Sequence, residues 1–219
     1  MRIHLTISLP DKPIPFNHQA GLKAVVQKWL GPQQETDAPL PLYSFSWLRG
    51  GQLVKQGVRF KEGASWFISA FDPALIKSLV TGIREDAVLW DDIYVKQIGI
   101  QDTPEFGPDA YCWLGSPILI KQYAEGISRH ITYEDANAGR LLETTLIRKA
   151  EKAGIVNPDI SIRFDVSYPK ARTKVVYYRG VGNKVNQCPV ILRGNPEMIA
   201  FAWDVGLGNS TGSGFGALI

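Results

Sequence analysis

The chain has 219 residues, of which 45% are hydrophobic and 21% charged, and its formal net charge is +3. This length fits one large or two small domains, and the composition is that of a globular protein able to bury a core. No apolar run is long enough to span a membrane, and no histidine or cysteine cluster has the spacing of metal ligands. The small positive charge permits a nucleic-acid partner without requiring one.

The two cysteines, Cys112 and Cys188, lie in apolar stretches far apart in the sequence. The first nine residues alternate between apolar and polar side chains, which is not the pattern of a signal peptide. We therefore expect two reduced core cysteines in a cytoplasmic protein.

The first half of the sequence shows the periods of strands and helices in the order β-α-β-β-α-β. Helical spacing covers residues 18–30, with Asn17 as a suitable N-cap. A second helix begins at Asp72-Pro73, with Asp72 as its N-cap and Pro73 at its first position. Residues 31–41 are polar and proline-rich, as in a loop. Strands are expected at residues 2–9, 42–48, 57–60, 65–71, 87–90 and 93–100.

The second half repeats this order after a polar, proline-bearing segment at residues 101–110. Helices are expected at 135–153 and from Asn195-Pro196 to Trp203, and strands at 111–120, 127–131, 160–167, 174–180 and 189–193. The sequence therefore predicts an α+β protein with two tandem ferredoxin-like (RRM-like, βαββαβ) domains, residues 1–105 and 106–219.

A glycine-rich segment follows the last predicted helix, with five glycines between Gly206 and Gly216. So many glycines allow the backbone to approach a bulky anion, and successive free N–H groups form a nest that attracts phosphate. The alternative is a flexible, frayed end of the chain. Apolar Leu207 and Phe215 favour a fixed loop, and residues 217–219 have the composition of a buried strand.

His18 is the best candidate for proton chemistry because it lies at the first turn of a predicted helix. A helix N-terminus disfavours the imidazolium, so the neutral base should dominate. Such a base can take a proton from a ribose 2′-hydroxyl. The alternative is that Asn17 and His18 only cap the helix; His130 and His4 are weaker candidates.

Basic residues form two clusters, and tyrosines are interleaved with the second. A β-ribbon that carries arginine and tyrosine suits RNA, although ordinary solvated strands also carry such charges. The tryptophans at 47, 66, 90, 113 and 203 are expected in the core. The first cluster is Arg140, Arg148, Lys149 and Lys152; the second is Arg163, Lys170, Arg172, Lys174, Arg179 and Lys184.

Six separate motifs occur in order along the chain. They are Ile14-Pro15-Phe16-Asn17-His18-Gln19, Leu42-Tyr43-Ser44-Phe45-Ser46, Ser116-Pro117-Ile118, Thr145-Leu146-Ile147-Arg148-Lys149, Leu192-Arg193-Gly194-Asn195-Pro196-Glu197, and Gly206-Leu207-Gly208 followed five residues later by Gly214-Phe215-Gly216. Together they resemble the CRISPR RNA-processing endoribonucleases of the RAMP superfamily, which cut precursor CRISPR RNA inside each repeat. The resemblance covers nearly the whole chain.

The resemblance implies cleavage without a metal or other cofactor. A general base takes the 2′-hydroxyl proton, and the oxygen attacks the adjacent phosphorus to leave a 2′,3′-cyclic phosphate and a 5′-hydroxyl. Many members use a tyrosine, a histidine and a lysine. Here the tyrosine and lysine positions hold Gln27 and Pro41, and residues 31–41 contain no histidine.

We therefore expect His18 as the base, with Lys28, Tyr43 or Ser46 nearby to position or neutralise the phosphate. The expected RNA contacts are Arg148, Lys149, Arg172, Lys174, Gly206, Gly208, Asn209, Ser210, Gly214 and Gly216. Two hypotheses stay open: an active endoribonuclease, and a repeat-RNA-binding member that has lost cleavage or cuts slowly. Expected partners are CRISPR repeat RNA and other CRISPR effector subunits, and the chain is expected as a monomer or a homodimer.

Overall fold

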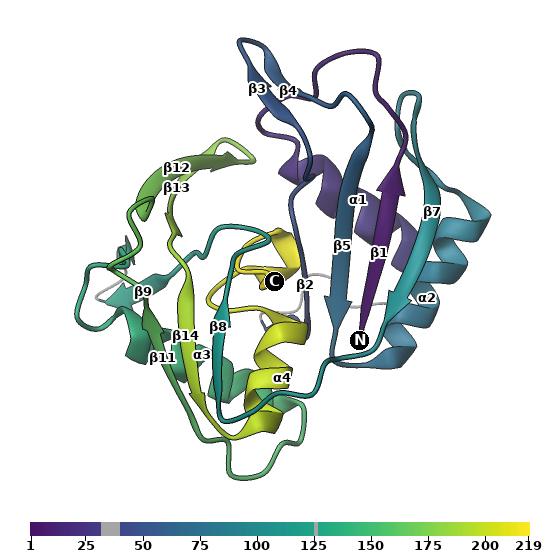
Figure 1. Cartoon of the computed structure of the whole chain (residues 1–219). Helices are drawn as coiled ribbons and strands as arrows, with labels where there is room; N and C mark the ends of the chain where they lie inside the picture. Colours follow the sequence, from purple (N-terminus) through teal and green to yellow (C-terminus); the bar gives the residue numbers. More distant parts are fainter. Residues whose placement is uncertain (32–39, 125–126) are drawn as a thin grey trace.

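The computed structural model describes residues 1–31, 40–124 and 127–219, so most of the loop predicted at 31–41 lies outside the described residues. The helices are Gln19–Leu30 (α1), Pro73–Glu85 (α2), Ala138–Lys152 (α3) and Pro196–Val205 (α4), with a 3-10 helix at Thr211–Ser213 (η1). Figure 1 shows two halves, with β1, β5 and β7 in one and β8, β11 and β14 in the other. Within the described ranges, no helix is long and apolar enough to cross a membrane.

The strands of the first half are Arg2–Ile7 (β1), Tyr43–Phe45 (β2), Gln52–Val54 (β3), Gly57–Arg59 (β4), Ala64–Ala70 (β5), Val88–Trp90 (β6) and Ile93–Gln101 (β7). Those of the second are Asp109–Cys112 (β8), Lys121–Ala124 (β9), Ile127–His130 (β10), Ile160–Phe164 (β11), Arg172–Tyr178 (β12), Val181–Gln187 (β13) and Val190–Gly194 (β14).

The first half contains a five-stranded antiparallel sheet in the order β2-β5-β1-β7-β6. The central strand β1 pairs with β5 and β7, and its Ile3, Leu5 and Ile7 are buried as the alternation predicts. Helices α1 and α2 pack together and contribute to the same core as the sheet. Without the short hairpin and β6, the four strands of this sheet lie in the order second, third, first, fourth along the chain. This is the strand order of a ferredoxin-like unit, so the fold predicted for the first half is confirmed.

Two details of the first half differ from the sequence expectations. The N-cap position of α1 is His18 rather than Asn17, and no side chain caps the helix there. The strand predicted at 57–60 does not join the five-stranded sheet; it pairs with β3 in a separate hairpin, and Val58 forms a bridge with Ile14. By contrast, Asp72 caps α2 by accepting a hydrogen bond from the Ala74 N–H at 2.8 Å, as predicted.

The second half contains a three-stranded sheet in the order β11-β14-β8. A bridge between Leu114 and Leu218 adds the predicted 217–219 segment next to β8, which completes the ferredoxin-like order. The strand predicted at 174–180 does not join this sheet; it forms the two-stranded β12–β13 hairpin, which stands apart in Figure 1. The domain division at residue 105, between β7 and β8, stays a prediction.

Arg2 links the two halves although it was expected on the polar face of β1. Its guanidinium carbon lies 3.9 Å from the Phe67 ring centroid and 3.4 Å from the Trp203 ring centroid. The guanidinium also donates to the carbonyl oxygens of Trp203 and Leu218, at 3.2 and 2.8 Å. Burial lowers the pKa of Arg2 to about 9, which leaves it charged at neutral pH. A buried cation whose donors are satisfied across the interface fixes how the halves meet.

Candidate functional site

The glycine-rich segment lies inside the molecule, not on its surface. Gly206, Gly208, Gly214 and Gly216 are all buried. Backbone hydrogen bonds hold the segment within the protein. The Leu207 N–H donates to the Gly216 carbonyl oxygen at 2.9 Å, and the Gly216 N–H donates to the Pro117 carbonyl oxygen at 2.8 Å. These four glycines are packed within the protein, so their burial argues against direct contact with RNA, and such a contact stays a prediction.

The middle of the same segment is half-buried. Asn209 accepts a hydrogen bond from the Lys121 N–H through Oδ1 at 2.7 Å, and its own N–H donates to Leu119 at 2.8 Å. Ser210 has a left-handed backbone, with φ 59°, at the start of η1. Both residues hold the loop together, and an RNA contact at either position stays a prediction.

Side chains from the first half bind the carbonyl oxygens of this segment. Gln19 donates to Ser213 at 2.5 Å, and Trp47 donates through Nε1 to Gly214 at 2.7 Å. Tyr43 donates its hydroxyl to the carbonyl of Gly212 at 3.3 Å. The segment thus joins the halves, and the alternative of a frayed end is also wrong.

Lys149 supports the segment from the other side. It is 1% exposed, and its Nζ donates to the Val205 and Gly206 carbonyls at 3.3 Å each and to Thr211 Oγ1 at 3.0 Å. Burial lowers the pKa of Lys149 to about 7. The ammonium of Lys149 is directed inward, which argues against an RNA contact, and such a contact stays a prediction.

The expected catalytic group does not assemble around His18. Lys28 is ten residues further along α1, about 15 Å away along the axis, and it pairs with Asp86 at 2.8 Å. Tyr43 is 3% exposed, and Ser46 is fully buried, with Oγ accepting a bond from the Phe67 N–H at 3.0 Å. Lys28, Tyr43 and Ser46 are therefore not available to position a phosphate at His18.

His18 instead faces a groove between the halves that consists of two adjoining pockets. The His18 pocket has a volume of about 650 Å³ and is lined by His18, Trp47, Arg172, Lys174 and Tyr177, among others. The Trp113 pocket has a volume of about 530 Å³ and is lined by Trp47, Trp113 and Tyr168, among others. Trp47, Arg172 and Gln187 line both pockets. We call the two together the inter-half groove.

The imidazole of His18 is held in one orientation. Its Nδ1 lies 2.8 Å from the carbonyl oxygen of Pro15, an acceptor, so we assign the proton of the neutral ring to Nδ1. Nε2 then carries the lone pair; it is buried and has no hydrogen-bond partner among the described residues. Burial lowers the pKa of His18, opposed by the Pro15 carbonyl and helped by the charge of Lys174. The neutral base is the dominant form at neutral pH.

Lys174 lies beside His18 on the opposite half. Its Nζ is 4.2 Å from the Trp47 ring centroid, in a cation–π contact. Burial, and then the charge of Arg172, lowers the pKa of Lys174 to about 8. Arg172 is exposed and donates through Nε to Gln187 Oε1 at 2.9 Å. The described residues that line the His18 pocket include Arg49, Arg172 and Lys174 and no carboxylate, so the pocket attracts anions.

The structure also places Arg148, the two cysteines and two of the tryptophans. Arg148 is exposed on α3, outside the residues that line either pocket. Cys112 and Cys188 are free and buried, as expected. Trp113 is 48% exposed and Trp47 is half-buried, so the expectation that both belong to the core is wrong.

The fold and the groove define a tandem ferredoxin-like protein with a cationic cleft between its halves. The family model described as CRISPR associated protein Cas6, C-terminal, matches residues 101–218, more than half of the chain. The chain therefore belongs to the Cas6 family.

Solved structures agree with this assignment in fold. A structure described as the characterization of a Cas6-related gene from Pyrococcus furiosus has a TM-score of 0.86 at 19% identity, covering 100% of this chain and 97% of that one. A CRISPR associated protein Cas6 has a TM-score of 0.84 at 22% identity, covering 100% and 98%. A RAMP protein described as binding different RNA substrates has a TM-score of 0.87 at 19% identity, also covering 100% and 98%. No curated protein matches the sequence.

Proposed function

We propose that this chain binds CRISPR repeat RNA in the inter-half groove and cleaves it within the repeat. The observation that carries the proposal is the meeting of His18 and Lys174, from opposite halves, in one pocket whose described lining residues include no carboxylate. Cationic grooves track an RNA backbone electrostatically, and half-buried aromatic rings such as Trp47 provide faces for unstacked bases. Membership of the Cas6 family supports the same substrate.

The proposed chemistry uses groups of this chain alone. Nε2 of His18 accepts the proton of a ribose 2′-hydroxyl, and that oxygen attacks the adjacent phosphorus. The bond from phosphorus to the 5′-oxygen breaks, leaving a 2′,3′-cyclic phosphate and a 5′-hydroxyl. Lys174 supplies a positive charge for the phosphate and, with a pKa of about 8, a proton for the leaving oxygen. Because Nε2 is buried, the side chains around it must move when RNA binds.

The test is cleavage of end-labelled repeat RNA by purified protein in EDTA. We expect a product with a cyclic phosphate end, and a His18→Ala rate that is lower by about 100- to 10,000-fold. His130→Ala is the matched control, because His130 lies on β10 and does not line the groove. A His18→Ala protein that cuts at the wild-type rate would exclude His18 as the base.

A second candidate function is repeat-RNA binding without cleavage. It is favoured by the buried Nε2 and by the placement of Tyr43 and Ser46 away from the groove. On this reading the His18 pocket holds a phosphate, and Lys174 matters more than His18. Tight binding of the repeat with no product after prolonged incubation would support it, and a cyclic phosphate product would rule it out.

A further inference from the structure

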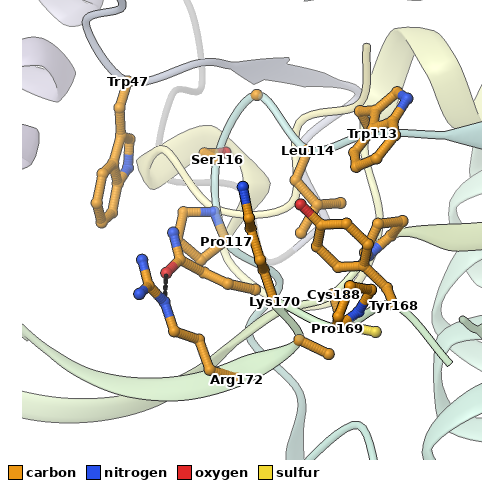
Figure 2. A pocket seen from close by; sticks show the side chains of 14 residues that line it. Trp47, Trp113, Leu114, Ser116, Pro117, Tyr168, Pro169, Lys170, Arg172 and Cys188 are labelled. Carbon is orange, nitrogen blue, oxygen red and sulfur yellow. Dashed lines mark hydrogen bonds between the residues drawn. The ribbon is translucent and has the colours of Figure 1, made fainter. Parts of the chain in front are cut away.

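The Trp113 pocket contains aromatic side chains that the proposed cleavage does not use. Figure 2 shows Trp47 and Trp113 at opposite sides of the pocket, with Lys170 and Pro117 between them. Tyr168 lines the pocket next to Trp113. Its volume of about 530 Å³ falls in the ordinary range for small-ligand sites, about 300–1,000 Å³.

The aromatic wall of this pocket is ordered and partly open to solvent. Trp113 is 48% exposed, and its ring centroid lies 5.3 Å from that of Tyr111 and 5.3 Å from that of Tyr168, both edge-to-face. Tyr111 donates its hydroxyl to Asp165 Oδ2 at 2.9 Å, and the Tyr168 N–H donates to the Asp165 carbonyl at 3.1 Å. Both tyrosines that flank the exposed indole are thus anchored to Asp165.

The charges around the pocket restrict what it can take. Lys170 and Arg172 line it, and none of its described lining residues is a carboxylate. Aromatic faces next to cations suit a flat, uncharged ring attached to an anion, which is the chemistry of a nucleotide. An apolar peptide side chain would use the tryptophans but not the two cations.

We propose that the Trp113 pocket is a subsite for one unpaired RNA base, stacked on Trp113 beside Tyr168, with its phosphate near Lys170 or Arg172. This proposal rests on the proposed function. It implies in addition that the RNA is single-stranded where it crosses this part of the groove. Because the pocket shares Trp47, Arg172 and Gln187 with the His18 pocket, the stacked base lies next to the segment bound at His18.

The experiment is an abasic scan of the repeat RNA, with affinity measured by fluorescence anisotropy. For the wild-type protein, one abasic position should weaken binding by about 5- to 150-fold, the range for a single base–aromatic stack. In Trp113→Ala the intact RNA should bind more weakly by a similar factor, and the abasic penalty at that position should disappear. Tyr123→Ala, which removes a 71% exposed tyrosine on β9, is the matched control and should behave as wild type.

The outcomes separate this proposal from the proposed function. If the wild-type protein does not bind the repeat, both fail. If it binds but the abasic profile is the same in Trp113→Ala, only the base subsite fails, and an occupant such as a partner protein's side chain gains support.

A second measurement covers a Trp113→Ala protein that does not fold. Trp113→Phe should keep most of the affinity and the abasic penalty. In the wild-type complex, 5-iodouridine at the sensitive position should photo-crosslink to a peptide containing Trp113 or Tyr168. A crosslink confined to other parts of the chain would overturn the proposal.

Discussion

The glycine-rich segment and the β12–β13 hairpin both have sequences typical of RNA-binding elements, yet they occupy opposite environments. The segment from Gly206 to Gly216 is mostly buried between the halves, and its main-chain bonds are made within the protein. The hairpin presents Arg172, Lys174 and Tyr177 to the inter-half groove. The contrast shows that glycine enrichment here reflects close packing of backbone against backbone, whereas the cations of the hairpin line the groove in which we propose that RNA binds.

The space around the glycines gives the physical reason. A Cβ on Gly206 would lie 2.7 Å from the Gly216 carbonyl oxygen, and one on Gly214 would lie 2.6 Å from the Phe45 ring. Only residues without a side chain let the segment fit against β2. At the tip of the hairpin, a Cβ on Gly180 would meet nothing within 4 Å.

The largest expected effect comes from an alanine in the buried segment. Gly216 has φ +67°, and an added Cβ would overlap the Leu207 carbonyl oxygen. We expect Gly216→Ala to lower the free energy of unfolding by about 3 kcal/mol or more, measured by urea denaturation. Gly180→Ala, with a similar φ of +79° but open space, is the control and should cost about 1 kcal/mol. Equal losses of stability in the two variants would contradict the difference in packing between the glycine-rich segment and the hairpin.

The next largest loss of stability is expected for Lys149 on α3, with its neighbour Arg148 as the control. Lys149→Ala leaves a cavity and two buried carbonyls without their donor, so unfolding should become easier by about 2–4 kcal/mol. The exposed Arg148→Ala should change stability by less than about 0.5 kcal/mol. Thermal unfolding of both variants checks this, and an unchanged Lys149→Ala protein would show that the ammonium does not stabilise the segment.

The pH dependence of cleavage tests the proposed pair of groups in the groove. The pKa of His18 is lowered, so its active base form should already dominate at neutral pH, and the rate should rise only on the acidic side. Lys174 loses its proton as the pH rises through its pKa of about 8, so the rate should fall above that value. The expected result is a bell-shaped pH–rate profile. Single-turnover rates should fall about tenfold per pH unit at either end of it. Lys174→Arg should lose the alkaline limb because arginine stays protonated.

The smallest expected effect is on the salt dependence of RNA binding. Arg172→Ala and Lys174→Ala should each reduce the slope of log K against log salt by about one unit if each neutralises one phosphate. Arg148→Ala should leave the slope unchanged because Arg148 lies outside the groove. A reduced slope for Arg148 alone would place the RNA path on α3 instead of the hairpin.

Local patterns predicted the fold well because each depends on neighbouring residues. The alternation in β1 and the cap at Asp72 agree with the structure, and the predicted strand at 217–219 is present as a bridge from Leu218 to Leu114. The same spacing rule could have revealed the burial of Lys149, because it lies three residues after Leu146 and seven after Leu142 on the buried stripe of α3. Its charge suggested exposure, but its position on the helix decides its burial.

The candidate site could be predicted only in part. His18 lies in the groove, although its catalytic role stays a prediction. The groove itself combines residues near positions 18, 47, 115 and 172, from separate elements of both halves. No local periodicity brings such segments together, so the exposure of Trp47 and Trp113 depends on tertiary packing that the sequence pattern does not contain.

The hydrogen bonds of the glycine-rich segment also restrict the order in which the protein can fold during synthesis. The bond from Gln19 to Ser213 spans 194 residues, and that from Trp47 to Gly214 spans 167. Contacts between such distant residues form slowly, after local structure. During synthesis, Gln19 and Trp47 therefore cannot form these bonds until the residues beyond 205 have been made. The groove, which is lined by residues of both halves, is therefore complete only after the second half has been made.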